Sequence, residues 1–160
     1  MKRLLPLLAV LGACSGNGAP APNGGAPGAD LSGFPVTRLN VGAVEFELWI
    51  ARSPAQQAQG LMNATASQLA PLPDGTPRGM LFAFSREQIL SFFMRDTFVA
   101  LDLAYARADG TIVEVFELIP LSEALVVSGQ PAQYALEAPA GTFLAQGIGP
   151  GTVIDVTSLP

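Results

Sequence analysis

Residues 101–118, LDLAYARADGTIVEVFEL, decide the fold because they encode a β-hairpin. Two apolar runs flank Asp109-Gly110, a dipeptide typical of a two-residue type I′ turn. If Ala108 pairs with Thr111 across this turn, the register of the whole ladder is fixed. The other opposite pairs are then Ala106–Val113, Tyr105–Glu114, Ala104–Val115, Leu103–Phe116, Asp102–Glu117 and Leu101–Leu118.

Most other periodic segments also favour strands. Apolar side chains alternate with others in VEFELWI (residues 44–50), which is the period of a half-buried strand. Residues 36–41 are predicted to pair with it through a turn at Gly42. Further strands are expected at residues 79–84, 89–94, 133–138 and 153–157.

Helices are predicted at two places. Ser53 and Pro54 have the residue types of an N-cap and a first helical position, so residues 55–61 are expected to form a short helix. Residues 140–147 are expected to form one or two helical turns. We therefore predict an α+β fold, a single compact domain over residues 34–160. Antiparallel strands dominate it as a barrel-like or strongly curved sheet, with one or two short helices.

The first 33 residues have the pattern of an export signal followed by a tether. A short basic start precedes the apolar run LLPLLAVL (residues 4–11), which is too short to span a bilayer, so residues 1–13 are predicted to be a signal peptide. Leu11-Gly12-Ala13-Cys14 resembles a bacterial lipobox, which implies lipidation of Cys14. Residues 14–33 are rich in Gly, Pro and Ala and are predicted to be a flexible linker. The chain is thus expected to be exported and lipid-anchored to the cell envelope, and Ser15 after the cysteine favours an outer membrane.

The composition excludes several kinds of active site. Beyond residue 13 the chain has six Arg and no Lys against 13 carboxylates, a formal charge of −7, and it has no His. Without His, Lys or a free thiol, Ser-His-Asp and Cys-His arrangements, Schiff bases and ordinary zinc sites cannot be assembled. An acidic domain repels phosphate backbones, so no nucleic-acid partner is expected, and we predict neither a metal nor a cofactor.

Five sequence blocks carry a family resemblance that runs from about Val44 to Val156. They are Gly60-Leu61-Met62, Gly79-Met80-Leu81-Phe82-Ala83-Phe84, Phe92-Phe93-Met94-Arg95-Asp96-Thr97, Leu101-Asp102 and Leu136-Glu137-Ala138-Pro139-Ala140-Gly141. In order and spacing they resemble the domain of unknown function 192 family. The chain departs from the usual family blocks with Phe93 for Trp, Arg95 for Lys, Asp96 for Asn and Ala100 for Pro. The resemblance implies a strand-rich domain often found in exported proteins, and it implies no reaction.

The hairpin register places two carboxylates, Asp102 and Glu117, directly opposite each other. Opposite Cβ atoms are about 4.5–5.5 Å apart, and like charges at that distance are destabilising. A protonated member, an arginine such as Arg95 or a bound cation would relieve the pair. Alternatively, both side chains point into water or a bulge shifts the register. Asp96-Thr97 is expected to be a hydrogen-bonded turn.

These observations favour a tethered, non-catalytic domain. We expect it to bind a small ligand, glycan or partner protein at the envelope, with candidate binding residues Arg95, Asp96, Asp102 and Glu117 and no catalytic residue. A carboxylate-dependent envelope hydrolase that uses Asp102 and Glu117 is the alternative, and a structural or assembly factor is a further one.

Overall fold

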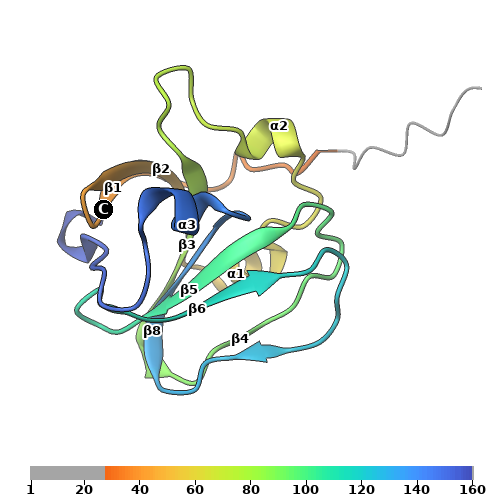
Figure 1. Ribbon diagram of the computed structural model, residues 1–160. Coiled ribbons are helices and arrows are strands. Elements are labelled where there is room, and N and C mark those ends of the chain that lie inside the picture. Colours follow the sequence, from red (N-terminus) through yellow and green to blue (C-terminus); the bar gives the residue numbers. More distant parts are fainter. Residues whose placement is uncertain (1–27, 160) are drawn as a thin grey trace, which may run out of the picture.

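Six strands form one mixed sheet in the order β1-β2-β3-β8-β5-β6 (Figure 1). The strands are β1 (Val36–Val41), β2 (Val44–Ala51), β3 (Arg78–Gln88), β8 (Ala132–Pro139), β5 (Leu101–Ala106) and β6 (Ile112–Leu118). Neighbours are antiparallel except β2 and β3, which are parallel. A second, two-stranded sheet consists of β4 (Ser91–Phe92) and β7 (Val126–Val127). The predicted α+β domain dominated by antiparallel strands is confirmed.

The computed structural model describes residues 28–159. The predicted signal peptide, Cys14 and most of the linker lie outside the described residues. Among those described, no helix is long and apolar enough to cross a membrane.

Within residues 28–159, three short helices and one 3-10 turn accompany the sheets, where the sequence predicted one or two helices. They are α1 (Pro54–Gln59), α2 (Ala66–Leu69), α3 (Thr142–Gln146) and η1 (Val156–Ser158). The predicted start of α1 is confirmed, because the Ser53 hydroxyl accepts from Gln56 N while the Gln56 side chain accepts from Ser53 N. Helix α2 was not predicted; it is only four residues long and shows no apolar period of its own.

The predicted hairpin register is largely confirmed, but the turn that connects the two strands differs from the predicted one. Tyr105 faces Glu114 and Asp102 faces Glu117, as expected. Gly110 has a φ of 83°, whereas Asp109 is not in the positive-φ region that a type I′ turn requires. The loop is longer by one residue, so Ala106 faces Ile112 instead of Val113. A register shift between Ala106 and Tyr105 then restores the predicted pairing from Tyr105 to Leu101.

The sheet is curved but not closed. Residues Val153 and Ile154 form isolated bridges with Thr111 and with Val41 of β1, respectively. The outer strands β1 and β6 are therefore linked through one short segment at this end, although they do not pair with each other. A strand at residues 153–157 was predicted; the bridges and η1 occupy this segment instead. The strand predicted at 89–94 is shorter, covering only Ser91–Phe92.

Both faces of the sheet are covered by apolar side chains. One cluster includes Trp49, Phe82 and Leu103 together with residues next to α1 and α2, and the other includes Phe46, Leu136 and Phe143 of α3. Strands β5 and β8 lie inside the sheet between these layers. All six residues of β5 are consequently buried.

Candidate ligand-binding site

Strand β8 carries an acidic side chain at the centre of the sheet. Glu137 pairs with Met80 on β3 and with Leu103 on β5, and its side chain shares their face of the sheet. The residue is only 4 % exposed. A carboxyl group is therefore held among apolar neighbours on both sides.

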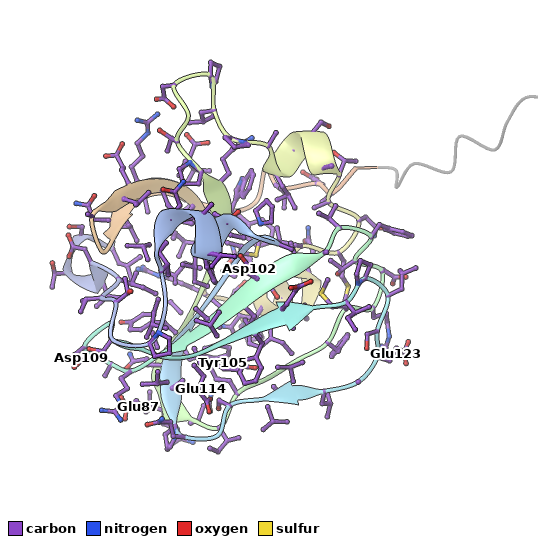
Figure 2. The ribbon with its side chains drawn as sticks, in the orientation of Figure 1. Glu87, Asp102, Tyr105, Asp109, Glu114 and Glu123 are labelled. Atoms are coloured by element: carbon purple, nitrogen blue, oxygen red, sulfur yellow. The ribbon has the colours of Figure 1, made fainter. Side chains whose placement is uncertain are left out.

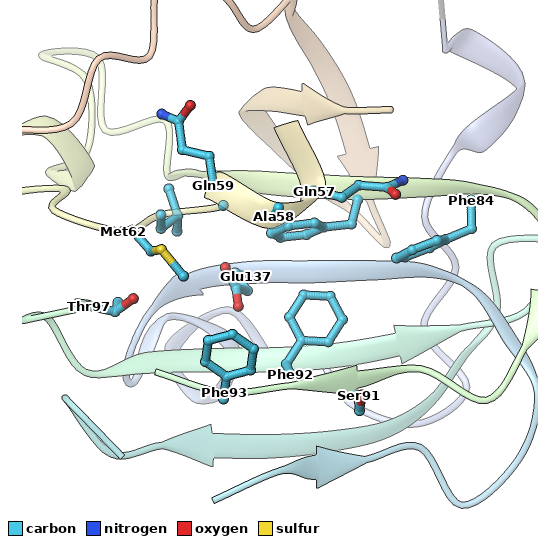
Figure 3. A pocket seen from close by; sticks show the side chains of 13 residues that line it. Gln57, Ala58, Gln59, Met62, Phe84, Ser91, Phe92, Phe93, Thr97 and Glu137 are labelled. Carbon is cyan, nitrogen blue, oxygen red and sulfur yellow. The ribbon is translucent and has the colours of Figure 1, made fainter. Parts of the chain in front are cut away.

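This carboxyl group opens into a pocket of about 270 Å³ between α1 and the β4 segment. Figure 3 shows the Glu137 carboxyl group directed into the space between Met62, Phe92 and Phe93. The lining residues are Gln57, Ala58, Gln59, Gly60, Leu61, Met62, Phe82, Phe84, Ser91, Phe92, Phe93, Thr97 and Glu137. Glu137 is the one ionisable side chain among them.

Two local features shape the pocket wall. Gly60 ends α1 with a φ of 49°, and a Cβ at this position would lie 3.3 Å from the Phe82 ring. The chain can therefore turn tightly over Phe82. The Phe82 and Phe92 rings then pack edge to face with centroids 4.8 Å apart, so strands from two different sheets form one aromatic wall.

No side chain or backbone group of residues 28–159 donates a hydrogen bond to the Glu137 carboxyl group, and its oxygens are not among the fully buried unpartnered atoms, so they face the pocket. Burial penalises its charged form and raises its pKa from 4.5 to about 8. The nearby Tyr105 hydroxyl donates to Val126 O at 2.6 Å instead. Burial raises the pKa of Tyr105, and the charges of Glu137 and Glu114 raise it further, so this phenol remains protonated.

The predicted pair of Asp102 and Glu117 is opposite in register but separate in environment. Asp102 is 7 % exposed and lies on the sheet face opposite to Glu137. Its carboxylate accepts hydrogen bonds from Gly141 N at 3.1 Å and Phe143 N at 2.8 Å, at the start of α3. Glu117 is exposed. Backbone N–H groups, not Arg95 or a cation, therefore stabilise the buried member of the pair.

The other two predicted site residues lie at the surface beside the pocket. Arg95 bonds to Glu123 at 3.1 Å, which raises the pKa of its guanidinium group, and it lies 5.0 Å from the Phe93 ring centroid. Figure 2 shows Glu123 and Asp102 well apart, so Arg95 and the carboxylate pair do not converge. Asp96 has a φ of 52° in a turn closed by Thr97 N to Met94 O. The predicted hydrogen-bonded turn at Asp96-Thr97 is thus confirmed.

Glu137 was missed as a site residue, although the sequence held a signal for it. In AQYALEAP (residues 132–139) Glu137 is the one charged residue in a strand that is otherwise uncharged and mostly apolar. Such a strand is buried on both faces when it lies inside a sheet, so its one charge needs a function or a partner. Within the described residues, no three or more His, Cys, Asp or Glu residues are grouped to hold a metal ion.

Fold and site together define a strand-rich α+β domain with one buried carboxyl group in an aromatic-walled pocket. A family model matches residues 37–156, and the chain belongs to this family, DUF192, described as "Uncharacterized ACR". The blocks on which the family resemblance rests supply most of the pocket: Gly60, Leu61, Met62, Phe82, Phe84, Phe92, Phe93, Thr97 and Glu137.

Two solved structures are similar to the chain. One is a "putative transcription regulator" from Sinorhizobium meliloti 1021, with 33 % identity and a TM-score of 0.64, covering 74 % of this chain and 89 % of that one. The other is a protein of unknown function from Novosphingobium aromaticivorans DSM 12444, with 26 % identity and a TM-score of 0.67, covering 80 % and 90 %. Comparison with curated proteins gives no match.

The role of Asp102 is tested by comparing Asp102→Asn with Glu117→Gln. An asparagine oxygen can accept one of the two N–H groups, but its NH₂ would face the other. We therefore expect a loss of about 1–3 kcal/mol in the free energy of unfolding, measured by urea denaturation at neutral pH. The exposed Glu117→Gln should stay within about 0.5 kcal/mol of the wild type. Equal effects of both substitutions would contradict a structural role that is specific to Asp102.

The burial of Glu137 predicts a pH-dependent stability. Below pH 4.5 the carboxyl group is protonated in both the folded and the unfolded chain. Between pH 4.5 and about 8 only the unfolded chain ionises, so stability falls by about 1.4 kcal/mol per pH unit from this group, and above about 8 the loss is complete. Glu137→Gln lacks this titration. The difference in free energy of unfolding, variant minus wild type, should therefore rise between pH 4.5 and about 8. If urea denaturation gives the same pH dependence of stability for the wild type and for Glu137→Gln, the Glu137 carboxylate is not destabilised by burial and the prediction is wrong.

Proposed function

We propose that this protein is an exported, lipid-tethered binding protein that holds a small organic ligand in the pocket around Glu137. One observation carries the proposal. A carboxyl group without a hydrogen-bond partner is buried at the floor of an open pocket, where its desolvation is unfavourable in the absence of a ligand. A ligand that bonds to this group compensates for its desolvation.

Binding is better supported than carboxylate-dependent hydrolysis. Glycosidase-type hydrolysis uses two carboxyl groups about 5–9.5 Å apart, on either side of the scissile bond. The pocket contains a single carboxyl group, Glu137. The carboxylate of Asp102 is held by backbone N–H groups on the other face of the sheet, and Glu117 is exposed. The hydrogen-bonded Asp102 carboxylate is therefore poorly placed to act together with the exposed Glu117 on one substrate.

A structural or assembly role has less support for the same reason. A purely structural domain has no need of an unpartnered carboxyl group next to an open cavity.

The description of the Sinorhizobium protein as a transcription regulator is not favoured for this chain either, because the formal net charge of −5 opposes binding to a phosphate backbone.

The tether defines where this ligand would be met. The basic start, the apolar run of residues 4–11 and the lipobox-like Leu11-Gly12-Ala13-Cys14 together favour export and lipidation of Cys14. The linker after Cys14 lacks the apolar residues needed to fold on its own. The domain would therefore sample the space near the envelope while a lipid anchor retains it there.

Ligand binding is tested by NMR on the isotope-labelled domain of residues 28–160 with a library of small polar and amphiphilic compounds. We expect chemical-shift changes to concentrate on Gly60, Phe92 and Glu137, and Glu137→Gln to weaken binding at least tenfold. Glu117→Gln is the matched control and should bind like the wild type. Shift changes confined to other surfaces, or no binding by any compound, would refute the proposed pocket function.

The anchor is tested by the substitution Cys14→Ala in the full chain. Loss of the acylated cysteine should move the protein from the membrane fraction to the soluble fraction after cell disruption. The folded domain should remain intact, with an unchanged urea midpoint. If the variant stays in the membrane fraction, the protein is not anchored through Cys14.

A further inference from the structure

We infer that the ligand of this pocket is a small organic cation, a substituted ammonium group that lies against the phenylalanine rings with Glu137 as its counter-ion. The inference rests on the proposed function and specifies the class of ligand. Three features of the lining carry it: the sign of its charge, the direction of its hydrogen-bond donors and the nature of its walls.

The ionisable groups of the lining do not favour an anion. Glu137 is the single ionisable residue that lines the pocket, and no Arg or Lys lines it. Below about pH 8 the carboxyl group is neutral and can donate one hydrogen bond, but the lining offers a bound anion no positive side chain as a counter-ion. A cation would instead form an ion pair there, in which burial strengthens the attraction.

Three polar side chains of the lining already donate to the protein, and the Ser91 hydroxyl is the fourth side-chain donor. Gln57 Nε2 donates to Ala83 O at 3.0 Å, and Gln59 Nε2 donates to Asp30 O at 2.8 Å. Thr97 Oγ1 donates to Arg95 O at 3.1 Å. These three side chains therefore present mainly their oxygens to a ligand, as does Glu137 once it is ionised. A ligand that supplies positive charge or N–H groups complements them, whereas one that supplies only acceptors does not.

The walls suit a cation that carries apolar substituents. Four phenylalanines line the pocket, and the negative face of an aromatic ring attracts a cation within about 6 Å of its centroid. The chain itself shows this at the rim, where the Arg95 guanidinium group lies 5.0 Å from the centroid of the Phe93 ring. A volume of about 270 Å³ is near the lower end for ligand pockets, which favours a compact ion.

Binding of such an ion changes the protonation of the site. The charge of Glu137 raises the pKa of Tyr105 on β5, so the Tyr105 phenol stays protonated. Asp102, on the same strand, faces the other side of the sheet. The cation therefore displaces one proton, which leaves Glu137 Oε and goes to the buffer. Since free Glu137 ionises only near pH 8, the affinity should fall about tenfold for each pH unit below that value.

The inference is tested by calorimetric titration with choline, which carries a permanent charge, and with 3,3-dimethylbutan-1-ol, its uncharged isostere. Tetramethylammonium and methylammonium complete the series. At pH 8.5 we expect choline to bind at least tenfold more tightly than the isostere. At pH 6.5 its affinity should be at least tenfold lower, with release of about one proton, as shown by buffers of different ionisation enthalpy. Glu137→Gln should lose choline binding, while Glu117→Gln should retain it.

The outcomes separate this inference from the proposed function. If the isostere binds as tightly as choline, or if no ammonium ion binds at 10 mM while other compounds bind at Gly60 and Phe92, the ligand is not a cation and the pocket function stands. If Glu137→Gln binds choline unchanged, Glu137 is not the counter-ion and the inference is refuted. If no compound binds at the pocket, both proposals are refuted. An unchanged near-ultraviolet circular dichroism spectrum of Glu137→Gln excludes misfolding as the cause of a loss.

Discussion

The structure depends on one constraint, the burial of strand β8 between β3 and β5 with apolar layers on both faces. Gly79 on β3 shows how closely these strands approach, because a Cβ there would lie within 2.2 Å of the Glu137 carbonyl oxygen. Only a residue without a side chain allows this approach. The strand that carries Glu137 is therefore held closely against β3, and its carboxyl group borders the pocket.

The Glu137 carboxyl group is destabilising where it lies. A pKa of about 8 against an ordinary 4.5 corresponds to a loss on the order of 5 kcal/mol above about pH 8, where the group is ionised in the folded chain, and the loss is smaller at lower pH. An apolar residue of similar volume would avoid this loss. Placement of an acid at this position is consistent with a binding role, because functional sites commonly retain groups that reduce stability.

Much of the fold was predictable from local patterns, and the site was not. The hairpin of residues 101–118, strands β1 and β2 and the N-cap at Ser53 each have a signal within a few residues, and all were found. The parallel pairing of β2 with β3 and the insertion of β8 between β3 and β5 bring together segments far apart in the chain. No local pattern encodes such pairings. The pocket depends on them, since its walls come from α1, β3, the β4 segment and β8.

Asp102 and Glu137 show what sequence spacing alone does not reveal about a buried acid. Both are buried, on adjacent strands and on opposite faces of one sheet. The sequence indicated Asp102 because it lies opposite Glu117 in the hairpin. In the structure, two backbone N–H groups donate to its carboxylate, and these bonds hold α3 against the sheet. Within residues 28–159 Glu137 has no such donors, and it borders a cavity. A buried acid with partners is explained by the fold, whereas one without partners in the fold can accept a partner that enters the pocket. The second case is the stronger indication of a binding site, and it becomes visible only when the strands on both sides are in place.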